Sequence, residues 1–376
     1  KKKIIGMKKL CLIYNTAPRY REAVFRAIDA EYDCDWYFGH TQTDIKEMDT
    51  ALLKNVNYYK TLGDPRKLYW KRGILKLLFS KKYQNFFMLA EARSITDHLF
   101  LGLATLLFPS KRIYIWTHGL YGKEKKVIVK MELWRFKKVS GVFVYGERAK
   151  KLLMEQGISE DKLFVIHNSL DYDTQKVLRG RIKPSDIYKK HFQNTNPTLI
   201  FIGRLTKVKR LDMVISAVAQ LHAKGELYNL VFVGDGLERE RLEQQVGDMK
   251  LQNNVWFYGA CYDEHKNAEL VYNADLCVSP GNVGLTAMHS LMFGCPVITH
   301  DNFAWQMPEF EAIHSGVTGD FFKQNDVEDL AKVISCWFTN KQKQRDDVRK
   351  VCYEEIDTNW NPHYQMDVIR HNLKLI

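Results

Sequence analysis

The sequence predicts an α/β protein with two Rossmann-like domains, and three observations carry this expectation. Short apolar runs that fit strands, such as "LCLIYN" (10–15) and "TLIFIG" (198–203), alternate with helical windows such as 212–224. The runs are continuously apolar, as in parallel strands that helices cover on both faces. The length of 376 residues exceeds the usual size of one hydrophobic core. We therefore expect two doubly wound domains that face each other across a cleft.

A polar stretch in the middle of the chain predicts the boundary between the domains. The segment "RIKPSDIYKKHFQNTNP" is rich in charged and amide residues and contains two prolines, and a new apolar run follows it at once. The chain then ends in a segment whose apolar positions fit a separate helix. The expected parts are an N-terminal domain over 1–175, a linker over 176–196, a C-terminal domain over 197–358 and a final helix over 359–376.

Composition narrows the class of protein. The chain is 45% hydrophobic and 27% charged, which fits a folded globular protein rather than a disordered one. Seven cysteines form no CxxC pair, and most lie in apolar runs, so we expect a reducing, cytoplasmic setting. We also expect no membrane-spanning helix and no signal peptide, because the apolar runs are too short. Met7 is a candidate start, which makes residues 1–6 candidates for non-native sequence.

The net charge of +12 is distributed unevenly, and two basic segments lie in the first half. Residues 54–82 hold nine lysines and arginines against one acid, and their apolar residues from Trp70 to Leu78 have helical spacing. Residues 123–138, "KEKKVIVKMELWRFKK", form the second segment. Either segment alone fits a solvated face over an ordinary core. Together they favour an anionic membrane surface or a lipid-pyrophosphate substrate, whereas no recognition motif supports nucleic acid as the partner.

Two cations follow the first strand of the second half. The strand ends at Gly203, Arg204 comes next, and Lys209 lies five residues further, before a helix that begins near Leu211. Arg204, through its planar fork, and Lys209, as a mobile point charge, can together neutralise a diphosphate. For either residue alone, a solvated loop cation is the plainer interpretation.

The stretch "SPGNVGLTAMHSLMFGCPVITH" (279–300) opens a helix with a glycine on each side of Asn-Val. The helix, from about Leu285 to Phe293, presents free backbone N–H groups and the positive end of its dipole near Gly284. Such a helix start suits phosphate or sugar oxygens, and glycine lets the backbone approach a ligand closely. His289 lies one turn inside and by itself fits an ordinary helix histidine.

Taken in order, these residues resemble the retaining glycosyltransferases of the GT-B fold, family four, also known as glycosyl transferases group 1. The ordered motifs are "GRL…K", "VGDG", "ADLCVSP", "GNVGL…H…GCPVIT" and "PE…GVTG", within residues 197–338. The first half is similar more loosely, through "IWTHG" (115–119) and residues 142–173. The resemblance implies transfer of a sugar from a nucleoside-diphosphate sugar to a hydroxyl with retention. It also implies that no metal or other cofactor is required, and that the last helix crosses back to the N-terminal domain.

The resemblance implies roles for individual residues. Arg204 and Lys209 match the pair that grips the donor diphosphate beside Gly203, and His118 matches a histidine near the sugar. These two cations and the histidine are the candidate catalytic residues. The segment against the nucleobase, the loop and helix at the sugar, and the acid of the "PE" motif complete the candidate donor site: Ala260, Cys261, Tyr262, Asn282, Val283, Gly284, Leu285, His289, and Glu309 or Glu311.

Two departures from the family pattern are visible. The family usually places glutamates eight positions apart where this chain has Gly281 and His289, and a neutral imidazole cannot make the bidentate contact of a carboxylate. The first strand-to-helix turn lacks the family's glycine-rich loop and instead holds "PRYR". Its residues Arg19, Tyr20 and Arg21 form a candidate acceptor loop, and helix capping and packing explain them equally well.

The sequence thus predicts a glycosyltransferase of bacterial surface-polysaccharide or lipid-linked glycan assembly. We expect a glycan or lipid-linked acceptor and a location in the cytoplasm or at the inner face of the membrane. A nucleotide-sugar epimerase of the same fold and a non-catalytic sugar-nucleotide binding protein stay open as alternatives. A nicotinamide dehydrogenase is disfavoured, because no GxGxxG opens a helix after the first strand.

Overall fold

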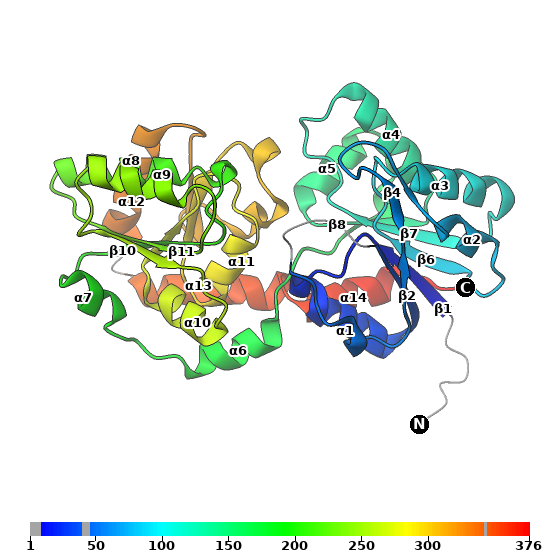
Figure 1. Ribbon diagram of the computed structural model, residues 1–376, viewed down its shortest axis with the longest axis horizontal. Coiled ribbons are helices and arrows are strands. Elements are labelled where there is room, and N and C mark those ends of the chain that lie inside the picture. The colour runs from blue at the N-terminus through cyan, green and yellow to red at the C-terminus, as the bar shows by residue number, and fades with distance from the viewer. Residues whose placement is uncertain (1–8, 40–45, 342–343) are drawn as a thin grey trace. The chain divides into compact units, whose positions relative to one another are not determined.

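A computed structural model describes residues 9–39, 46–341 and 344–376, and the chain divides into two compact units (Figure 1). Unit 1 runs to Asp171 and includes Pro362–Ile376, and unit 2 is Tyr172–Asn361. The expectations about Met7 and residues 1–6 lie outside the described residues.

Unit 1 is built on a seven-stranded parallel sheet in the order β3-β2-β1-β6-β7-β8-β9. The apolar runs of the sequence form the central strands, and both faces of these strands are buried. The strands are β1 (Lys9–Tyr14), β2 (Asp33–Gly39), β3 (Val56–Tyr59), β6 (Asn85–Met88), β7 (Arg112–Thr117), β8 (Gly141–Val144) and β9 (Leu163–Val165).

Helices cover both faces of this sheet. Successive residues of β1 point to opposite sides, so Cys11 and Ile13 join one core while Leu10, Leu12 and Tyr14 join the other. The helices of unit 1 are α1 (Glu22–Glu31), α2 (Ile74–Phe79), α3 (Ile95–Leu107), α4 (Lys126–Lys137), α5 (Glu147–Glu155) and α14 (Pro362–Asn372).

The end of the chain is fixed to the sheet of unit 1. Helix α14 packs beside α1, with Ile369 fully buried, and Arg370 pairs with Glu31 at 2.8 Å. Beyond the helix, the backbone N–H of Lys374 donates to the Tyr114 hydroxyl at 3.0 Å. The last residue donates to Asn85 Oδ1 at 2.9 Å. These contacts place residues 362–376 with the N-terminal sheet.

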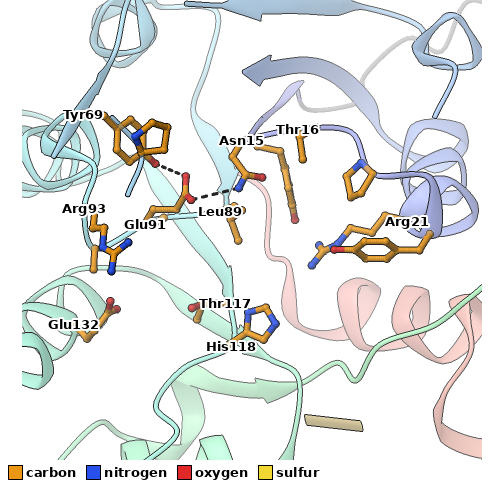
Figure 2. A pocket seen from close by; sticks show the side chains of 16 residues that line it. Asn15, Thr16, Arg21, Tyr69, Leu89, Glu91, Arg93, Thr117, His118 and Glu132 are labelled. Atoms are coloured by element: carbon orange, nitrogen blue, oxygen red, sulfur yellow. Dashed lines mark hydrogen bonds between the residues drawn. The ribbon is translucent and has the colours of Figure 1, made fainter. Parts of the chain in front are cut away.

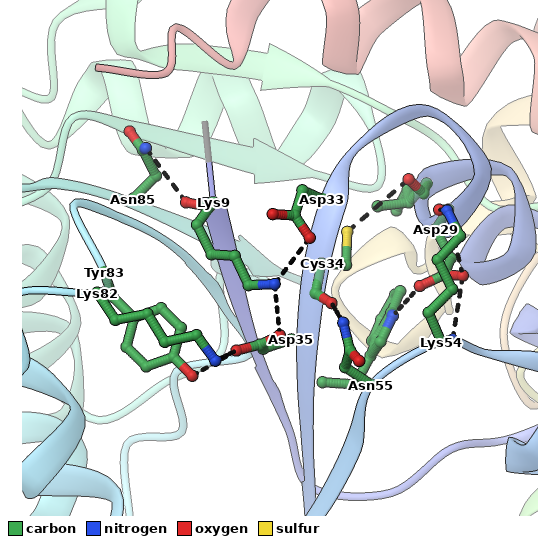
Figure 3. Close-up of polar contacts among 12 residues, drawn as sticks. Lys9, Asp29, Asp33, Cys34, Asp35, Lys54, Asn55, Lys82, Tyr83 and Asn85 are labelled. Carbon is green, nitrogen blue, oxygen red and sulfur yellow. Dashed lines mark hydrogen bonds and ion pairs between the residues drawn. The ribbon is translucent and has the colours of Figure 1, made fainter. Parts of the chain in front are cut away.

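A charged network holds the amino ends of β1 and β2 together (Figure 3). Lys9 Nζ lies 2.7 Å from Asp33 Oδ1 and 2.9 Å from Asp35 Oδ1, and the Tyr83 hydroxyl donates to Asp35 at 2.6 Å. Burial works to raise the pKa of Asp35, but hydrogen bonds from Lys82, Tyr83 and Lys9 outweigh it and lower the pKa. Ligands of parallel sheets bind at the carboxyl ends of the strands, so this network is structural.

The segment 54–82 differs from the amphipathic helix that its spacing predicts. It forms β3, then an antiparallel hairpin of β4 (Thr61–Gly63) and β5 (Tyr69–Lys71), and only then α2. Gly73 has φ of 90° and separates β5 from α2, so the helix cannot begin at Trp70. Lys71 is fully buried and lies 2.9 Å from Asp97, so this cation is absent from the surface of the segment.

Unit 2 has a six-stranded parallel sheet in the order β12-β11-β10-β13-β14-β15. This order corresponds to 3-2-1-4-5-6 of the Rossmann fold and reverses between β10 and β13. The elements are β10 (Thr198–Ile202), β11 (Asn229–Val233), β12 (Val255–Gly259), β13 (Leu276–Val278), β14 (Val297–His300), β15 (Gly319–Phe322), α6 (Tyr172–Arg181), α7 (Ile187–Phe192), α8 (Leu211–Ala223), α9 (Arg239–Asp248), α10 (Glu264–Asn273), α11 (Leu285–Met292), α12 (Val327–Lys341) and α13 (Arg345–Asn359). The predicted α/β class with two Rossmann-like domains is confirmed.

Residues 176–196, expected as a linker, lie within unit 2 and form the end of α6 and all of α7. Tyr188 and Phe192 are buried, and the Tyr188 hydroxyl donates to the carbonyl of Leu270 at 2.6 Å. Arg179 pairs with Asp357 on α13 at 2.7 Å. Because many residues of this segment are charged, its composition did not predict the few apolar and paired side chains that fix it to the domain.

Candidate functional site

The strand order of unit 2 brings the two glycine-containing loops of the sequence together. Because β10 and β13 are neighbours, the loops that follow them leave the same edge of the sheet on either side of the reversal point. Thr286, in the first turn of α11, donates from its hydroxyl to the carbonyl of Ile202 at 2.9 Å. The start of α11 is thereby fixed next to Gly203 and Arg204.

Lys209 is the centre of the candidate donor site. Its Nζ donates to the carbonyl of Asn282 at 2.6 Å, and the position of a Cβ on Gly284 would be 3.9 Å from Nζ. Burial lowers the pKa of Lys209 to about 8; the negative charge of Glu309 opposes this shift and the positive charge of Arg204 adds to it. The structure therefore brings Arg204, Lys209, Asn282, Gly284 and Glu309 into one cluster.

The cluster also bears on the choice between the two candidate acids. Glu309 is 3% exposed, and its charge acts on Lys209, which places it at the candidate donor site. Arg204 is exposed at the end of β10. Glu311 is partly exposed on the same short helix, two residues further along the chain.

One backbone N–H group of the loop before α11 is hydrogen-bonded within the protein. The sequence predicts that the amides of residues 282–285 face a ligand, but the N–H of Val283 donates to Gln306 Oε1 at 2.9 Å. Gln306 is 2% exposed and donates in turn to Thr299 Oγ1 at 2.8 Å. The expectation is wrong for Val283, and Gln306 is a loop-positioning residue that the motifs did not reveal. Asn282 Oδ1 is buried and has no hydrogen-bond partner among the described residues.

The Gly234-Asp235-Gly236 turn after β11 has a packing role. A Cβ on Gly234 would lie 1.8 Å from the carbonyl oxygen of Gly203, and one on Gly236 would lie 2.3 Å from that of Leu205. Both glycines therefore let two strand-end loops touch through their backbones.

Unit 1 carries a separate cavity of about 420 Å³ at the carboxyl ends of β1, β6 and β7 (Figure 2). Tyr20, Arg21 and His118 line it, whereas Arg19 is exposed and does not, and the acceptor role of this loop stays a prediction. Burial, and next the charge of Arg21, lower the pKa of His118 to about 4. The imidazole is therefore neutral at physiological pH.

Sequence reasoning missed two acids of this cavity. Glu91 follows β6 and accepts hydrogen bonds from Asn15 at 3.3 Å and from the Tyr69 hydroxyl. Glu132, on α4, pairs with Arg135, and its burial raises its pKa. Glu91 was detectable, since it comes directly after the apolar run "NFFMLA".

Comparison with known proteins decides the family. Residues 183–354 match the family model of glycosyl transferases group 1. An uncharacterized 41.2 kDa protein in the cps region of Klebsiella pneumoniae is 24% identical over 72% of this chain and 66% of its own length. A GDP-mannose-dependent α-(1-6)-phosphatidylinositol dimannoside mannosyltransferase of Mycobacterium tuberculosis is 30% identical over 40% of this chain and 38% of its own length. The part of the chain over residues 183–354 belongs to the group 1 glycosyltransferases.

The GT-B fold is supported by solved structures. The Anabaena protein Alr3699/HepE, solved in complex with UDP, has a TM-score of 0.72 at 18% identity, over 97% of this chain and 99% of its own. The matches to the two curated relatives span less than two thirds of the length of each. The predicted family is confirmed, and the mycobacterial relative is by its name a mannosyltransferase that acts on a phosphatidylinositol dimannoside.

The first departure of this glycosyltransferase from its family has a steric basis. A Cβ on Gly281 would lie 2.0 Å from the carbonyl oxygen of Val208 and 2.7 Å from Cα of Lys209. The N–H of Gly281 also donates to the carbonyl of Lys209 at 2.9 Å. The backbone of 208–209 thus occupies the space that a side chain at position 281 needs, and this loop conformation excludes the family's glutamate.

The second departure comes with a carboxylate from another helix. His289 Nε2 lies 2.9 Å from Glu264 Oε1, which also accepts from Gln175 Nε2 at 2.7 Å. Burial works to raise the pKa of Glu264, but the hydrogen bond and charge of His289 outweigh it and lower the pKa. Glu264 opens α10 directly after the loop of Ala260, Cys261 and Tyr262, of which Tyr262 is 85% exposed. The sequence motifs did not reveal Glu264.

An apolar surface lies on α3 and α4 of the glycosyltransferase. A second cavity, of about 390 Å³, is lined there by His98, Val127, Lys130, Met131 and Trp134. Val127 is 59% and Leu106 of α3 is 76% exposed. Within the described residues, no helix combines the length and apolarity that crossing a membrane requires.

Proposed function

We propose that this glycosyltransferase moves a sugar from a nucleoside-diphosphate sugar to a hydroxyl of a glycan or glycolipid, with retention at the anomeric carbon. The observation that carries the proposal is the position of Lys209, which is half-buried, bonded through Nζ to the loop before α11 and near Arg204. UDP is the first nucleotide to test, because the Anabaena neighbour binds UDP. The cps region of the Klebsiella relative supports a role in surface-polysaccharide assembly.

In the proposed reaction the bond from the anomeric carbon to the diphosphate breaks and a bond to the acceptor oxygen forms. The departing diphosphate takes the acceptor proton, so the chain needs no separate general base. Arg204, Lys209 and the N–H groups at the start of α11 stabilise the charge that grows on the leaving group. The buried Asn282 Oδ1 offers an acceptor to a sugar hydroxyl.

The carboxylate of Glu264 is our candidate for a contact to the ribose of the donor, because it lies against His289, where the family usually has a glutamate. Its pKa is lowered, so it is ionised at neutral pH and accepts hydrogen bonds from hydroxyls. His289 holds one oxygen of this carboxylate, and the side chain of Glu264 remains 35% exposed. Glu264 and His289 together take the place of the single glutamate that the family usually has at position 289.

The proposal is tested by transfer and hydrolysis assays with UDP-glucose and other nucleotide sugars in the wild type and in Arg204→Ala. Loss of one charge contact to the transition state should lower turnover by about a hundredfold or more. Arg241→Ala is the matched control, since this arginine is half-exposed on α9 and pairs with Glu238. An Arg204→Ala rate equal to that of the wild type contradicts the phosphate role. Conversion of the sugar while still bound to the nucleotide, without acceptor, indicates the epimerase instead.

We further propose that the surface of α3 and α4 rests on an anionic membrane. Its exposed apolar residues Leu106, Val127 and Trp134 lie among exposed lysines such as Lys126 and Lys130. Apolar side chains enter the headgroup region while lysines attract anionic lipid. Vesicles of phosphatidylglycerol should sediment the wild type, and Val127→Gln with Trp134→Gln should weaken this binding. Leu237→Gln in unit 2, where Leu237 is 98% exposed, should not. Equal sedimentation of all three contradicts the proposal.

A further inference from the structure

Arg21 is a buried cation without a carboxylate partner among the described residues. Its residue is 6% exposed, and it ends the short helix that precedes α1. Aromatic rings surround its guanidinium: the central carbon lies 4.7 Å from the ring centroid of Trp116, 5.2 Å from that of Tyr145 and 5.6 Å from that of Tyr14. The rings attract the cation, yet they supply no negative charge. A buried guanidinium of this kind is normally paired.

The same cage contains four buried polar atoms that make no well-formed hydrogen bond in the described part of the chain, although Arg21 lies close enough to the Tyr14 hydroxyl for a weak one. They are Tyr14 Oη, Arg21 Nη1, Trp116 Nε1 and Tyr145 Oη. Buried polar atoms are nearly always paired, so four in one contact cluster indicate a missing ligand. Arginine and tryptophan nitrogens only donate, and tyrosine hydroxyls can donate. The missing group is therefore a hydrogen-bond acceptor.

The position of Arg21 makes the missing group part of the cavity of unit 1. Tyr14 and Arg21 both line this cavity, and Figure 2 shows the Arg21 side chain extending toward His118. A volume of about 420 Å³ is near the lower end of the range for small-molecule sites, which suits a single sugar with one substituent.

The acids of the cavity do not neutralise Arg21. Glu91 is 3.5 Å from Lys71 and is bound by Asn15 and Tyr69 on the β4-β5 side. Glu132 is paired with Arg135. His118, at the cavity and stacked near Tyr145 with centroids 4.6 Å apart, is neutral. An anionic group on Arg21 would complete both the charge and the hydrogen bonds of the cage.

We propose that this cavity selects an anionic acceptor sugar, with a carboxylate or phosphate group seated on Arg21 and within reach of the Tyr14 hydroxyl. This inference rests on the proposed function, since it takes the cavity of unit 1 as the acceptor site. A carboxylate points to a uronic acid residue and a phosphate to a phosphorylated sugar. Both are oxyanions that a guanidinium fork binds in bidentate geometry.

The test is calorimetric titration of the full chain with glucuronate, glucose 6-phosphate and glucose at matched ionic strength. Wild type and Arg26→Gln, a control on α1 whose side chain is 58% exposed, should bind one of the two anions more tightly than glucose. Arg21→Gln should bind that anion at least about tenfold more weakly, the loss expected for a charge-assisted contact. The anion that binds more tightly identifies carboxylate or phosphate.

Two further measurements keep the result decisive. UDP titration of each variant reports unit 2 separately, so absent UDP binding in the wild type counts against the proposed function. UDP binding without any preference for an anion over glucose overturns only the anionic acceptor. If Arg21→Gln does not fold, Tyr14→Phe keeps the ring under the guanidinium and removes one donor. It should weaken the anion and leave glucose unchanged; equal affinity for the anion in wild type and Tyr14→Phe then overturns the proposal.

Discussion

Gly281→Ala adds a single methyl group, and the structure predicts that this small change has a large effect. The added methyl group would lie 2.0 Å from the carbonyl oxygen of Val208 and 2.7 Å from the carbonyl carbon of Lys209. Both neighbouring atoms belong to the backbone, so the methyl group cannot be accommodated by the rotation of a flexible side chain. The φ angle of Gly281 lies outside the left-handed region, and the cost therefore comes from space rather than from backbone strain.

The magnitude follows from two contributions. Overpacking of a rigid site costs about 1–3 kcal/mol. Moving the 208–209 backbone also breaks the hydrogen bond from Gly281 to the Lys209 carbonyl, which contributes about 0.5–1.5 kcal/mol. The sum is about 1.5–4.5 kcal/mol. For a domain the size of unit 2, each kcal/mol lowers Tm by about 2–4 °C, so the expected decrease is on the order of 3–18 °C.

Scanning calorimetry of the wild type, Gly281→Ala and Gly180→Ala checks this prediction. Gly180 lies in α6 of the same unit, and a Cβ added there would have no neighbouring atom within 4 Å, so alanine should be neutral or stabilise by up to about 1 kcal/mol. Gly281→Ala should also weaken UDP binding, because Lys209 moves with its loop. Unchanged melting of Gly281→Ala would show that the loop of 208–209 does not lie against residue 281.

Two further predictions concern the donor site. The pKa of Lys209, lowered by burial to about 8, predicts that UDP affinity falls as the pH rises through 8, and Lys209→Met should bind UDP weakly at every pH. Between about pH 8 and the ordinary lysine pKa of 10.5, Lys209 is largely deprotonated in the folded chain without ligand but protonated in the unfolded chain. The free energy of unfolding of the wild type should therefore rise with pH in this range. The variant Lys209→Met should not show this rise. Glu264→Gln should weaken UDP about tenfold in calorimetric titration and leave inorganic pyrophosphate unchanged, since only UDP carries a ribose. Equal losses for both ligands contradict the ribose role.

The hydrophobic pattern and the alternation of strands with helices carried most of the fold prediction. Continuous apolar runs identified the buried strands of both sheets, since parallel strands are covered on both faces. The pattern failed where few residues decide the structure. Gly73 ends the hairpin before α2, and two buried aromatic residues of α7 fix a segment that otherwise reads as a polar linker. Neither effect changes the average composition of its segment.

The sequence predicted those candidate site residues whose place in the fold follows from their position after a strand. Arg204 and Lys209 come directly after a strand that the sequence reveals, and parallel topology then places them beside the loop after β13. Partners from distant segments were not predictable. Gln306 occupies the Val283 amide, and Glu264 reaches His289 from α10, although no spacing in the sequence links these pairs. The unpaired atoms of the Arg21 cage likewise come from four separate segments.

The missing family glutamate at position 281 and the lowered pKa of Lys209 have one structural cause. Because Gly281 has no side chain, the backbone of 208–209 lies directly against it, and Lys209 is held under the loop by the Asn282 carbonyl. This close approach buries the amine and lowers its pKa to about 8. A diphosphate placed at the start of α11 stabilises the protonated amine, so the bound donor restores the charge that burial disfavours. The glycine therefore leaves the loop without the family's carboxylate and brings against it a cation whose charge depends on the bound phosphate.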